Sequence, residues 1–378
     1  MDKICILVRV LWPGGPQRIA FKEAKILREK GLDVDLVFLR ETKRFPNDFA
    51  ITRYSVINTQ ESTQRVLEPF FRLITLHYNQ GRGDDATIDI DYIAIFNLFK
   101  NKYDIVIYFD QFTALFSTLN KVLKGSKKIV YVHETAFREK HSYFNKLLEK
   151  MALFKSDYIL TVSETNRNLL LKRGYNNVGV LFPGIDRVGK ERSFEERENI
   201  LISATVWEEW RKPEILIEIA RSLKNTKIIL AGQWTSDQYR KKINQRIEKG
   251  GLSGKVQITG TLTQINLDRL YSKCKVAIRF GYNERGPGMG SLEAISYGLP
   301  LIVNQGIGIR DFLSKYNYEL VFDEYDVARI AETIDRLCSD KAYWQNISSK
   351  CSDIARENSW EAHTNKLISI INSLKIKR

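Results

Sequence analysis

Short apolar runs alternate along this chain with longer segments in which apolar residues recur every three or four positions. The runs indicate buried strands, the longer segments indicate helices, and their regular alternation is typical of a parallel α/β architecture. The pattern predicts strands at Lys3–Arg9, Asp33–Leu39, Ile105–Tyr108, Lys128–Val132, Tyr158–Val162, Asn199–Ala204, Lys227–Ala231, Lys255–Thr259, Val276–Phe280 and Leu301–Val303.

The clearest predicted helix runs from Gln17 to Lys30, where apolar residues share one face and Gly31 follows at the usual place for a helix end. Residues 41–102 are the least regular part of the chain. Within them we expect one helix, at Glu61–Tyr78.

A length of 378 residues exceeds one ordinary core and predicts two domains. Between the two halves, the segment Arg187–Asn199 is highly charged, as a domain connection would be. We therefore expect an N-terminal domain of residues 1–185, a C-terminal domain of residues 186–358, and a last helix within residues 359–378 that packs back toward the first domain.

Composition narrows the class of protein. No apolar run approaches the roughly 20 residues of a membrane span, and the four cysteines follow no disulfide or metal-ligand spacing. We expect a cytoplasmic protein without a metal site. The net charge of +14 favours anionic partners, but no recognised nucleic-acid motif accompanies it, so we expect no nucleic-acid partner.

The segment Lys140–Lys155 combines lysines with an apolar helical stripe of Phe144, Leu147, Leu148 and Met151. Such a helix can lie on an acidic membrane surface, which would place the protein peripherally at the inner face of the membrane. It can equally pack on its own sheet with its lysines in water. Both interpretations stay open.

The segment Asn283–Ala294 is a glycine-rich loop between an apolar strand and a helix expected to begin near Ser291. Without side chains at its glycines, backbone N–H groups can approach an anion, and the helix N-terminus adds further donors. Glu293, expected in the first helical turn, could accept hydrogen bonds from a ribose. No Gly-Lys-Ser/Thr ending follows, so the loop favours a nucleotide sugar over a triphosphate. A simple turn with a solvated acid is the alternative.

Three further places combine a strand end with candidate chemistry. Gly14 and Gly15 follow the first strand, His133 follows the fourth, and Arg211 with Lys212 follows the first strand of the second half. Carboxyl ends of parallel strands are where α/β proteins bind ligands. His133 could contact a sugar or phosphate, and the two cations could neutralise a diphosphate. Plain turns remain the alternative interpretation.

Together these residues resemble a GT-B glycosyltransferase of the retaining family 4 type. The likeness is carried by Trp12–Arg18 with Glu23 and Ala24, Thr161–Glu164 with Phe182–Asp186, Arg211–Glu214 with Leu216–Glu218, Gly286–Pro300, and Ser359–Glu361. The resemblance implies two Rossmann-like domains facing across a cleft. It also implies transfer of a sugar from a nucleoside diphosphate to a glycan or lipid-linked acceptor, with retention at the anomeric carbon and with neither cofactor nor obligatory metal.

The same resemblance assigns roles to individual residues. Gly14 and Gly15 would form the wall beside the diphosphate, His133 would contact the transferred sugar, and Arg211 and Lys212 would stabilise the departing diphosphate. Glu293 would hold the ribose. Backbone groups of four loop residues would hold the sugar or phosphate: Gly286, Pro287, Gly288 and Met289.

Two departures from the family pattern leave alternatives open. The family has two glutamates separated by seven residues, but counting back from Glu293 the first position holds Arg285, with Glu284 one place earlier. Either Glu284 takes the sugar-side role or Arg285 contacts the donor instead. In addition, the arginine that usually precedes the family's lysine is replaced within Ala204–Trp207. A catalytically inactive protein that binds nucleotide sugars is therefore the alternative function.

Overall fold

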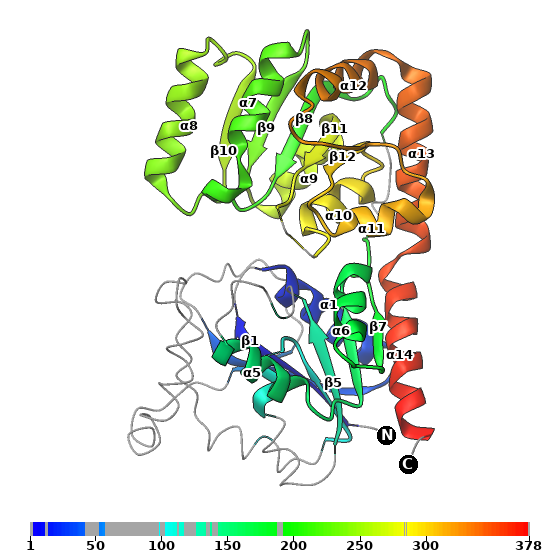
Figure 1. Ribbon diagram of the computed structural model, residues 1–378. Coiled ribbons are helices and arrows are strands. Elements are labelled where there is room, and N and C mark those ends of the chain that lie inside the picture. Colours follow the sequence, from blue (N-terminus) through cyan, green and yellow to red (C-terminus); the bar gives the residue numbers. More distant parts are fainter. Residues whose placement is uncertain are drawn as a thin grey trace. The chain divides into compact units, whose positions relative to one another are not determined.

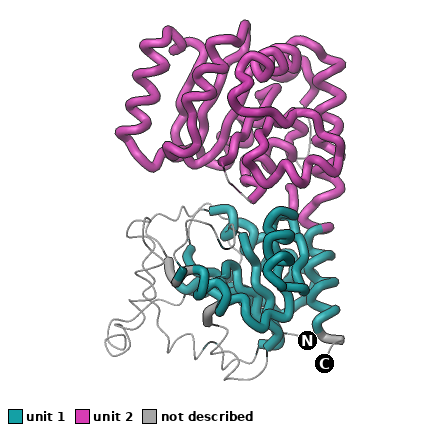
Figure 2. The backbone as a smooth tube through the Cα atoms, in the orientation of Figure 1, with its two compact units in different colours: residues 1–183, 363–378 teal, residues 184–362 magenta. Residues whose placement is uncertain are grey.

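The chain forms two compact units, each built around one parallel sheet (Figures 1 and 2). This computed structural model describes residues 3–11, 14–41, 53–56, 98, 103–111, 113–116, 126–133, 137, 143–186, 192–282, 284 and 286–376. The first unit comprises residues 1–183 and 363–378, and the second comprises residues 184–362. The sequence predicts domain ends at residues 185 and 358, and the two units divide after residues 183 and 362. Two Rossmann-like α/β domains are confirmed.

The seven-stranded sheet of the first unit has the strand order β3-β2-β1-β4-β5-β6-β7, with all neighbours parallel. Because the order reverses between β1 and β4, their carboxyl ends flank a topological switch point. The strands are β1 (Lys3–Leu11), β2 (Asp33–Glu41), β3 (Ser55–Val56), β4 (Ile105–Tyr108), β5 (Lys127–Val132), β6 (Tyr158–Thr161) and β7 (Val178–Val180). The described helices are α1 (Gly15–Glu29), η3 (Thr113–Phe116), α5 (Tyr143–Leu153), α6 (Glu164–Lys172) and most of α14 (Trp360–Ile376).

The second unit repeats this plan with six parallel strands in the order β10-β9-β8-β11-β12-β13, so its switch point lies between β8 and β11. The strands are β8 (Glu198–Ala204), β9 (Lys227–Ala231), β10 (Val256–Gly260), β11 (Cys274–Arg279), β12 (Leu301–Asn304) and β13 (Val321–Phe322). The helices are η4 (Glu209–Arg211), α7 (Pro213–Ser222), α8 (Asp237–Lys249), α9 (Gln264–Lys273), α10 (Met289–Ser296), α11 (Ile309–Leu313), η5 (Ser314–Tyr316), α12 (Val327–Ser339) and α13 (Lys341–Glu357).

The predicted strands all match observed strands to within two residues at each end. They were recognisable because central parallel strands are buried on both faces and form continuous apolar runs. Strands β3, β7 and β13 were not predicted, since two or three residues are too few for a periodic signal. The expected helix at Glu61–Tyr78 lies outside the described residues. No described helix is long and apolar enough to cross a membrane.

Buried Arg197 fastens the elements that carry the second unit's switch point. Its side chain donates to the carbonyl oxygens of Tyr271 at 3.2 Å, Cys274 at 2.9 Å and Tyr297 at 2.8 Å. These carbonyls belong to the end of α9, the start of β11 and the residue after α10. One guanidinium therefore fixes three elements against one another.

We expect Arg197→Met to destabilise the second unit by about 3 kcal/mol, because it leaves several buried carbonyls without a donor. The corresponding fall in the thermal midpoint is about 6 °C or more for a unit of this size. Thermal unfolding followed by circular dichroism measures it. Arg221→Met, at an exposed arginine of α7, is the matched control and should change the midpoint by no more than about 2 °C. An equal effect of both substitutions would contradict the role of Arg197.

Candidate functional site

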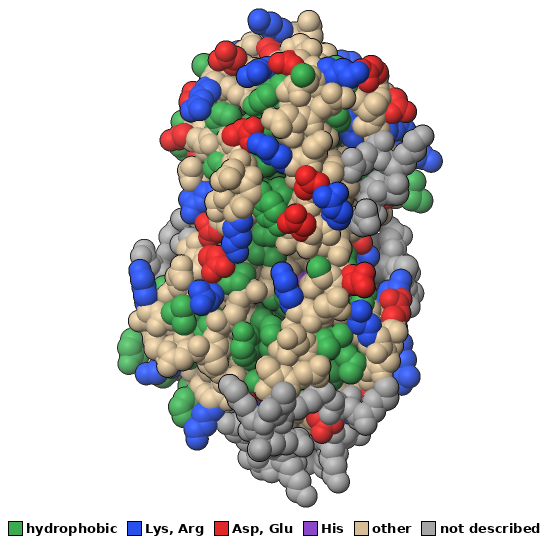
Figure 3. All heavy atoms as spheres, turned by 90° about the vertical axis from the view of Figure 1, so that its right-hand side faces the viewer, with side chains coloured by type: hydrophobic (Ala, Val, Ile, Leu, Met, Phe, Trp, Pro, Cys, Tyr) green, Lys and Arg blue, Asp and Glu red, His purple; other side chains and the backbone are tan. Residues whose placement is uncertain are grey.

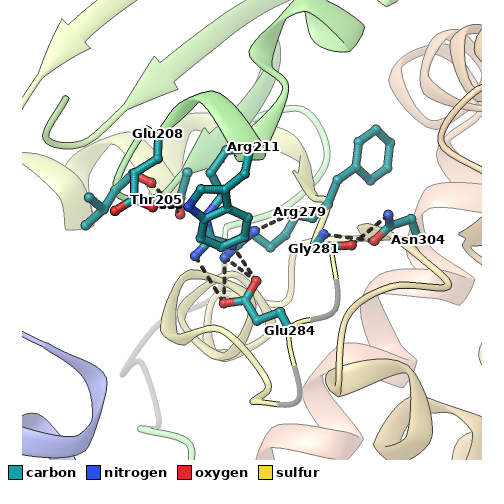
Figure 4. A network of polar contacts seen from close by, with 10 residues as sticks. Thr205, Glu208, Arg211, Arg279, Gly281, Glu284 and Asn304 are labelled. Atoms are coloured by element: carbon teal, nitrogen blue, oxygen red, sulfur yellow. Dashed lines mark hydrogen bonds and ion pairs between the residues drawn. The ribbon is translucent and has the colours of Figure 1, made fainter. Parts of the chain in front are cut away.

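An ion-pair cluster lies at the switch point of the second unit, where both guanidinium groups point toward the Glu284 carboxylate (Figure 4). Arg279 ends β11, and its Nη2 donates to the two carboxylate oxygens of Glu284 at 3.0 and 2.9 Å. Arg211 lies in η4 after β8; its Nη2 donates to Glu284 Oε1 at 3.2 Å and its Nη1 pairs with Oε2. The cluster thus joins the segments that follow the two central strands.

The cluster is largely shielded from water. The Arg279 side chain is 5% exposed, that of Arg211 11% and that of Glu284 20%. Burial lowers the pKa of Arg279 to about 10, although the Glu284 carboxylate opposes this change. Burial alone would raise the pKa of Glu284, but Arg279 and Arg211 together bring it below its usual value. Two cations and one anion leave a net positive charge at the switch point.

Two buried polar atoms beside this cluster have no hydrogen-bond partner among the described residues: Arg211 Nε and Ser291 Oγ. A Cβ atom at Gly288 would lie 3.4 Å from Arg279 Nε and 3.5 Å from Ser291 Oγ, so Arg279 and Ser291 both lie against the glycine-rich loop. Buried groups without a partner are uncommon in folded proteins. Donors of this kind next to a net positive charge can bind an anion.

Glycine is required at two positions where α10 begins. Gly288, the residue before the helix, has a φ of +70°, a conformation that L side chains rarely adopt. A Cβ at Gly290 would lie 2.4 Å from the carbonyl oxygen of Ala204 at the end of β8. The helix begins at Met289 rather than near Ser291, so Glu293 lies past the first turn and the expectation of a first-turn acid is wrong. The helix follows directly after Gly288, whose positive φ turns the chain there, and so it begins earlier than the sequence suggested.

The Glu293 carboxylate is held by a residue that sequence analysis missed. The Tyr271 hydroxyl lies 3.2 Å from Glu293 Oε2 and 3.3 Å from the Gly290 carbonyl oxygen. Tyr271 is 1% exposed, and its ring stacks on that of Tyr297. In the sequence it is an ordinary apolar position of α9. Arg279 was also missed, although a cation at the end of an apolar strand is a signal of a buried charge.

Lys212 lies next to Arg211 in the chain but contacts different partners. It has a φ of +47° between η4 and α7. Its Nζ donates to the Tyr325 hydroxyl at 2.5 Å and lies 4.5 Å from the centre of the Tyr282 ring. The two cations that the sequence grouped together therefore face separate groups. Gly286 and Pro287 lie in the described part of the loop, and Arg285 lies outside the described residues.

In the first unit, Gly14 and His133 both follow strands at the carboxyl edge of the sheet. The Gly14 carbonyl accepts a hydrogen bond from the Arg18 amide at 3.2 Å, and Gly15 is the first residue of α1. The His133 ring follows β5, is 9% exposed, and stacks on Tyr131 with ring centres 4.2 Å apart. The histidine is thus fixed in orientation by an aromatic neighbour.

Two sequence families match this chain in succession. Residues 13–188 match Glycosyltransferase Family 4, and residues 186–358 match Glycosyl transferases group 1. The chain belongs to the group 1 glycosyltransferases of the GT-B fold. Together the two matches cover every named residue of the candidate site and every described strand except β1.

Individual proteins are similar to this glycosyltransferase over different lengths. An uncharacterized glycosyltransferase of Methanocaldococcus jannaschii is 24% identical over 238 residues, which are 55% of this chain and 59% of that protein. The structure of HepE from Anabaena in complex with UDP has a TM-score of 0.75 and 15% identity, and the match covers 98% of this chain and 100% of that one. Sucrose-phosphate synthase from Thermosynechococcus elongatus has a TM-score of 0.73 and 14% identity, with 100% of both chains covered. At these identities the structural matches show a shared fold.

We expect Gly290→Ala to displace the start of α10, because its Cβ and the Ala204 carbonyl oxygen cannot both keep their positions. Overpacking of this kind costs about 1–3 kcal/mol. Urea unfolding measures the loss. Gly254→Ala is the matched control, since a Cβ there meets nothing within 4 Å. Equal stability of the two variants would show that Gly290 is not needed for the close approach.

Proposed function

We propose that this protein transfers a sugar from a UDP-sugar to a glycan or lipid-linked saccharide, with retention of the anomeric configuration. The observation that carries the proposal is the Arg211–Glu284–Arg279 cluster beside the glycine-rich loop and α10, at the switch point of the second sheet. Family membership supports sugar transfer, and the family resemblance supports retention.

The cluster suits the chemistry of a departing diphosphate. When the bond between the anomeric carbon and the diphosphate oxygen breaks, negative charge accumulates on the diphosphate. Guanidinium groups already fixed in place, together with the N-terminus of α10, stabilise that charge without reorganising. In this account Arg211 and Arg279 hold the diphosphate, Lys212 adds a cation, and the Glu293 carboxylate accepts hydrogen bonds from the ribose hydroxyls.

Glu284 has a positioning role in this proposal. Its carboxylate is engaged by two arginines, so it orients the groups that bind phosphate. The sugar side would be completed by Arg285 and by backbone groups of Gly286–Met289. For Gly14, Gly15 and His133 of the first unit we propose the roles that the family resemblance implies.

The choice of UDP over other nucleoside diphosphates is supported by the structural relatives. HepE of Anabaena has been solved with UDP and with UDP-glucose, in the second case at a TM-score of 0.71 to this chain. A lipid-linked acceptor would bring the protein to a membrane surface, for which Lys140–Lys155 was the candidate segment.

A protein that binds a nucleotide sugar without transferring it is the second candidate. It is favoured by Arg285 at the position of the family's first glutamate and by the ion pairs that occupy Glu284. Release of UDP from UDP-glucose or UDP-galactose, with membrane extracts as acceptor, separates the two. Tight binding with no UDP released would favour the second candidate.

We expect Glu293→Ala to weaken UDP binding about 10-fold or more, because hydrogen bonds to a charged group contribute about 1.5–3 kcal/mol. Isothermal titration calorimetry measures the affinity. Glu332→Ala on the exposed surface of α12 is the matched control and should leave it unchanged. Unchanged affinity of the Glu293 variant would count against the ribose role.

We expect Arg211→Met to weaken UDP binding about 10- to 100-fold and uridine binding by less than about twofold, since only UDP carries the diphosphate. Titration of both ligands, with circular dichroism to check folding, makes the comparison. Arg329→Met, on α12, is the control. An equal loss for UDP and uridine would exclude a specific role of Arg211 at the phosphates.

A further inference from the structure

Four large apolar side chains are exposed along α5 and the turn after it. Tyr143 is 86% exposed, Leu147 42%, Met151 51% and Phe154 61%. Spacings of four, four and three residues place them on one helical stripe. Every other described large apolar side chain with such exposure belongs to the second unit. We call these four residues the α5 stripe.

The α5 stripe differs from the stripe that the sequence suggested. Leu148, which sequence analysis grouped with Leu147 and Met151, is 4% exposed and faces the core. The side chain of Phe144 lies outside the described residues. Part of the expected stripe was therefore wrong: the apolar residues of α5 form two faces, one covered by the sheet and one exposed.

Buried polar contacts fix which face of α5 is exposed. Glu149, the acid of this helix, is turned inward and accepts hydrogen bonds from the Phe137 amide at 2.7 Å and from Gln111 Nε2 at 3.3 Å. Lys128, on β5 and 2% exposed, donates its Nζ protons to the carbonyl oxygens of Ala152 and Phe154 at the helix end. The acid is thus removed from the outer surface, while Lys150 remains exposed there.

A basic cavity of about 830 Å³ lies at the C-terminal end of α5, within the first unit. Its charged lining residues are Lys127, Lys150, Lys155, Arg173 and Asp157, and its apolar lining includes Phe154 of the α5 stripe. Asp157 is already paired, since its carboxylate accepts from Lys127 Nζ at 3.1 Å and from the Lys128 amide at 2.7 Å. Four cations against one acid leave the cavity with an excess of positive charge.

This cavity is distinct from the candidate site residues Gly14 and His133 of the first unit. Lys127 begins β5 and Tyr158, another lining residue, begins β6, so the cavity lies at the amino edge of the first sheet. Gly14 and His133 follow the carboxyl ends of their strands. On the face drawn in Figure 3, basic side chains are interspersed with acidic ones.

We propose that the α5 stripe and the basic cavity bind the surface of an anionic phospholipid bilayer. The cavity takes a headgroup phosphate, while the α5 stripe enters the boundary between headgroups and acyl chains. Charge complementarity and the continuity of apolar and cationic groups at Phe154 support a bilayer over a protein partner. The inference deepens the proposed function, because a lipid-linked acceptor requires the enzyme at such a surface.

Flotation with unilamellar vesicles tests the proposal. The full-length protein should bind vesicles containing 30 mol% phosphatidylglycerol (an amount on the order of that in anionic membranes) and should not bind pure phosphatidylcholine vesicles. Lys150→Glu/Lys155→Glu should lower the partition coefficient about 30-fold or more, since each lysine near an anionic surface contributes roughly fivefold. Leu147→Gln/Met151→Gln should lower it by a similar factor.

Matched controls are Lys241→Glu on α8 and Ile265→Gln on α9, both exposed in the second unit. Failure of the unmodified protein to float with anionic vesicles, or equal losses in control and test variants, would overturn the proposal. The proposal would also be overturned if the protein dimerised through the α5 stripe, and if Leu147→Gln/Met151→Gln abolished the dimer without changing vesicle binding. Glu293→Ala should bind vesicles as the unmodified protein does. If the unmodified protein bound vesicles but had no affinity for UDP, only the donor assignment would be refuted.

Discussion

The Glu284 carboxylate joins two arginines that would otherwise repel one another in a site almost closed to water. Arg211 follows β8 and Arg279 ends β11, so this one acid holds together the segments beyond the two central strands of the second sheet. Breaking a buried ion pair by removing one partner typically costs about 3–5 kcal/mol. The positions of Arg211 and Arg279, which we propose bind the diphosphate, therefore depend on a residue that need not touch the sugar.

Close backbone packing then places the glycine-rich loop against this cluster. The Asn304 side chain accepts from the Gly281 amide and donates to the Gly281 carbonyl, both at 2.9 Å, which fixes the loop to the end of β12 (Figure 4). Gly290 lets α10 begin against Ala204, and the Tyr271 hydroxyl reaches both Gly290 and Glu293. Direct contacts thus link the described part of the loop, the helix start and the Glu293 carboxylate.

The central strands and the glycine-rich loop could be predicted because each has a local signal: a continuous apolar run in one case and repeated glycines in the other. The Arg211–Glu284 pair had none, since its partners are 73 residues apart and meet only through the order of the strands. Likewise, periodicity located the apolar residues of α5 but not the face that β5 covers. The partition between Leu148 and the α5 stripe depends on tertiary packing, which a single segment does not encode.

A crystal structure of the protein with UDP tests directly whether the Arg211–Glu284–Arg279 cluster holds the diphosphate. We expect the diphosphate to lie within hydrogen-bonding distance of Arg211 and of the loop at Gly288–Gly290, with the ribose hydroxyls at the Glu293 carboxylate. UDP bound with its ribose on Glu293 but its phosphates away from Arg211 and Arg279 would contradict the role of the cluster. UDP bound elsewhere on the protein would contradict the donor site as a whole.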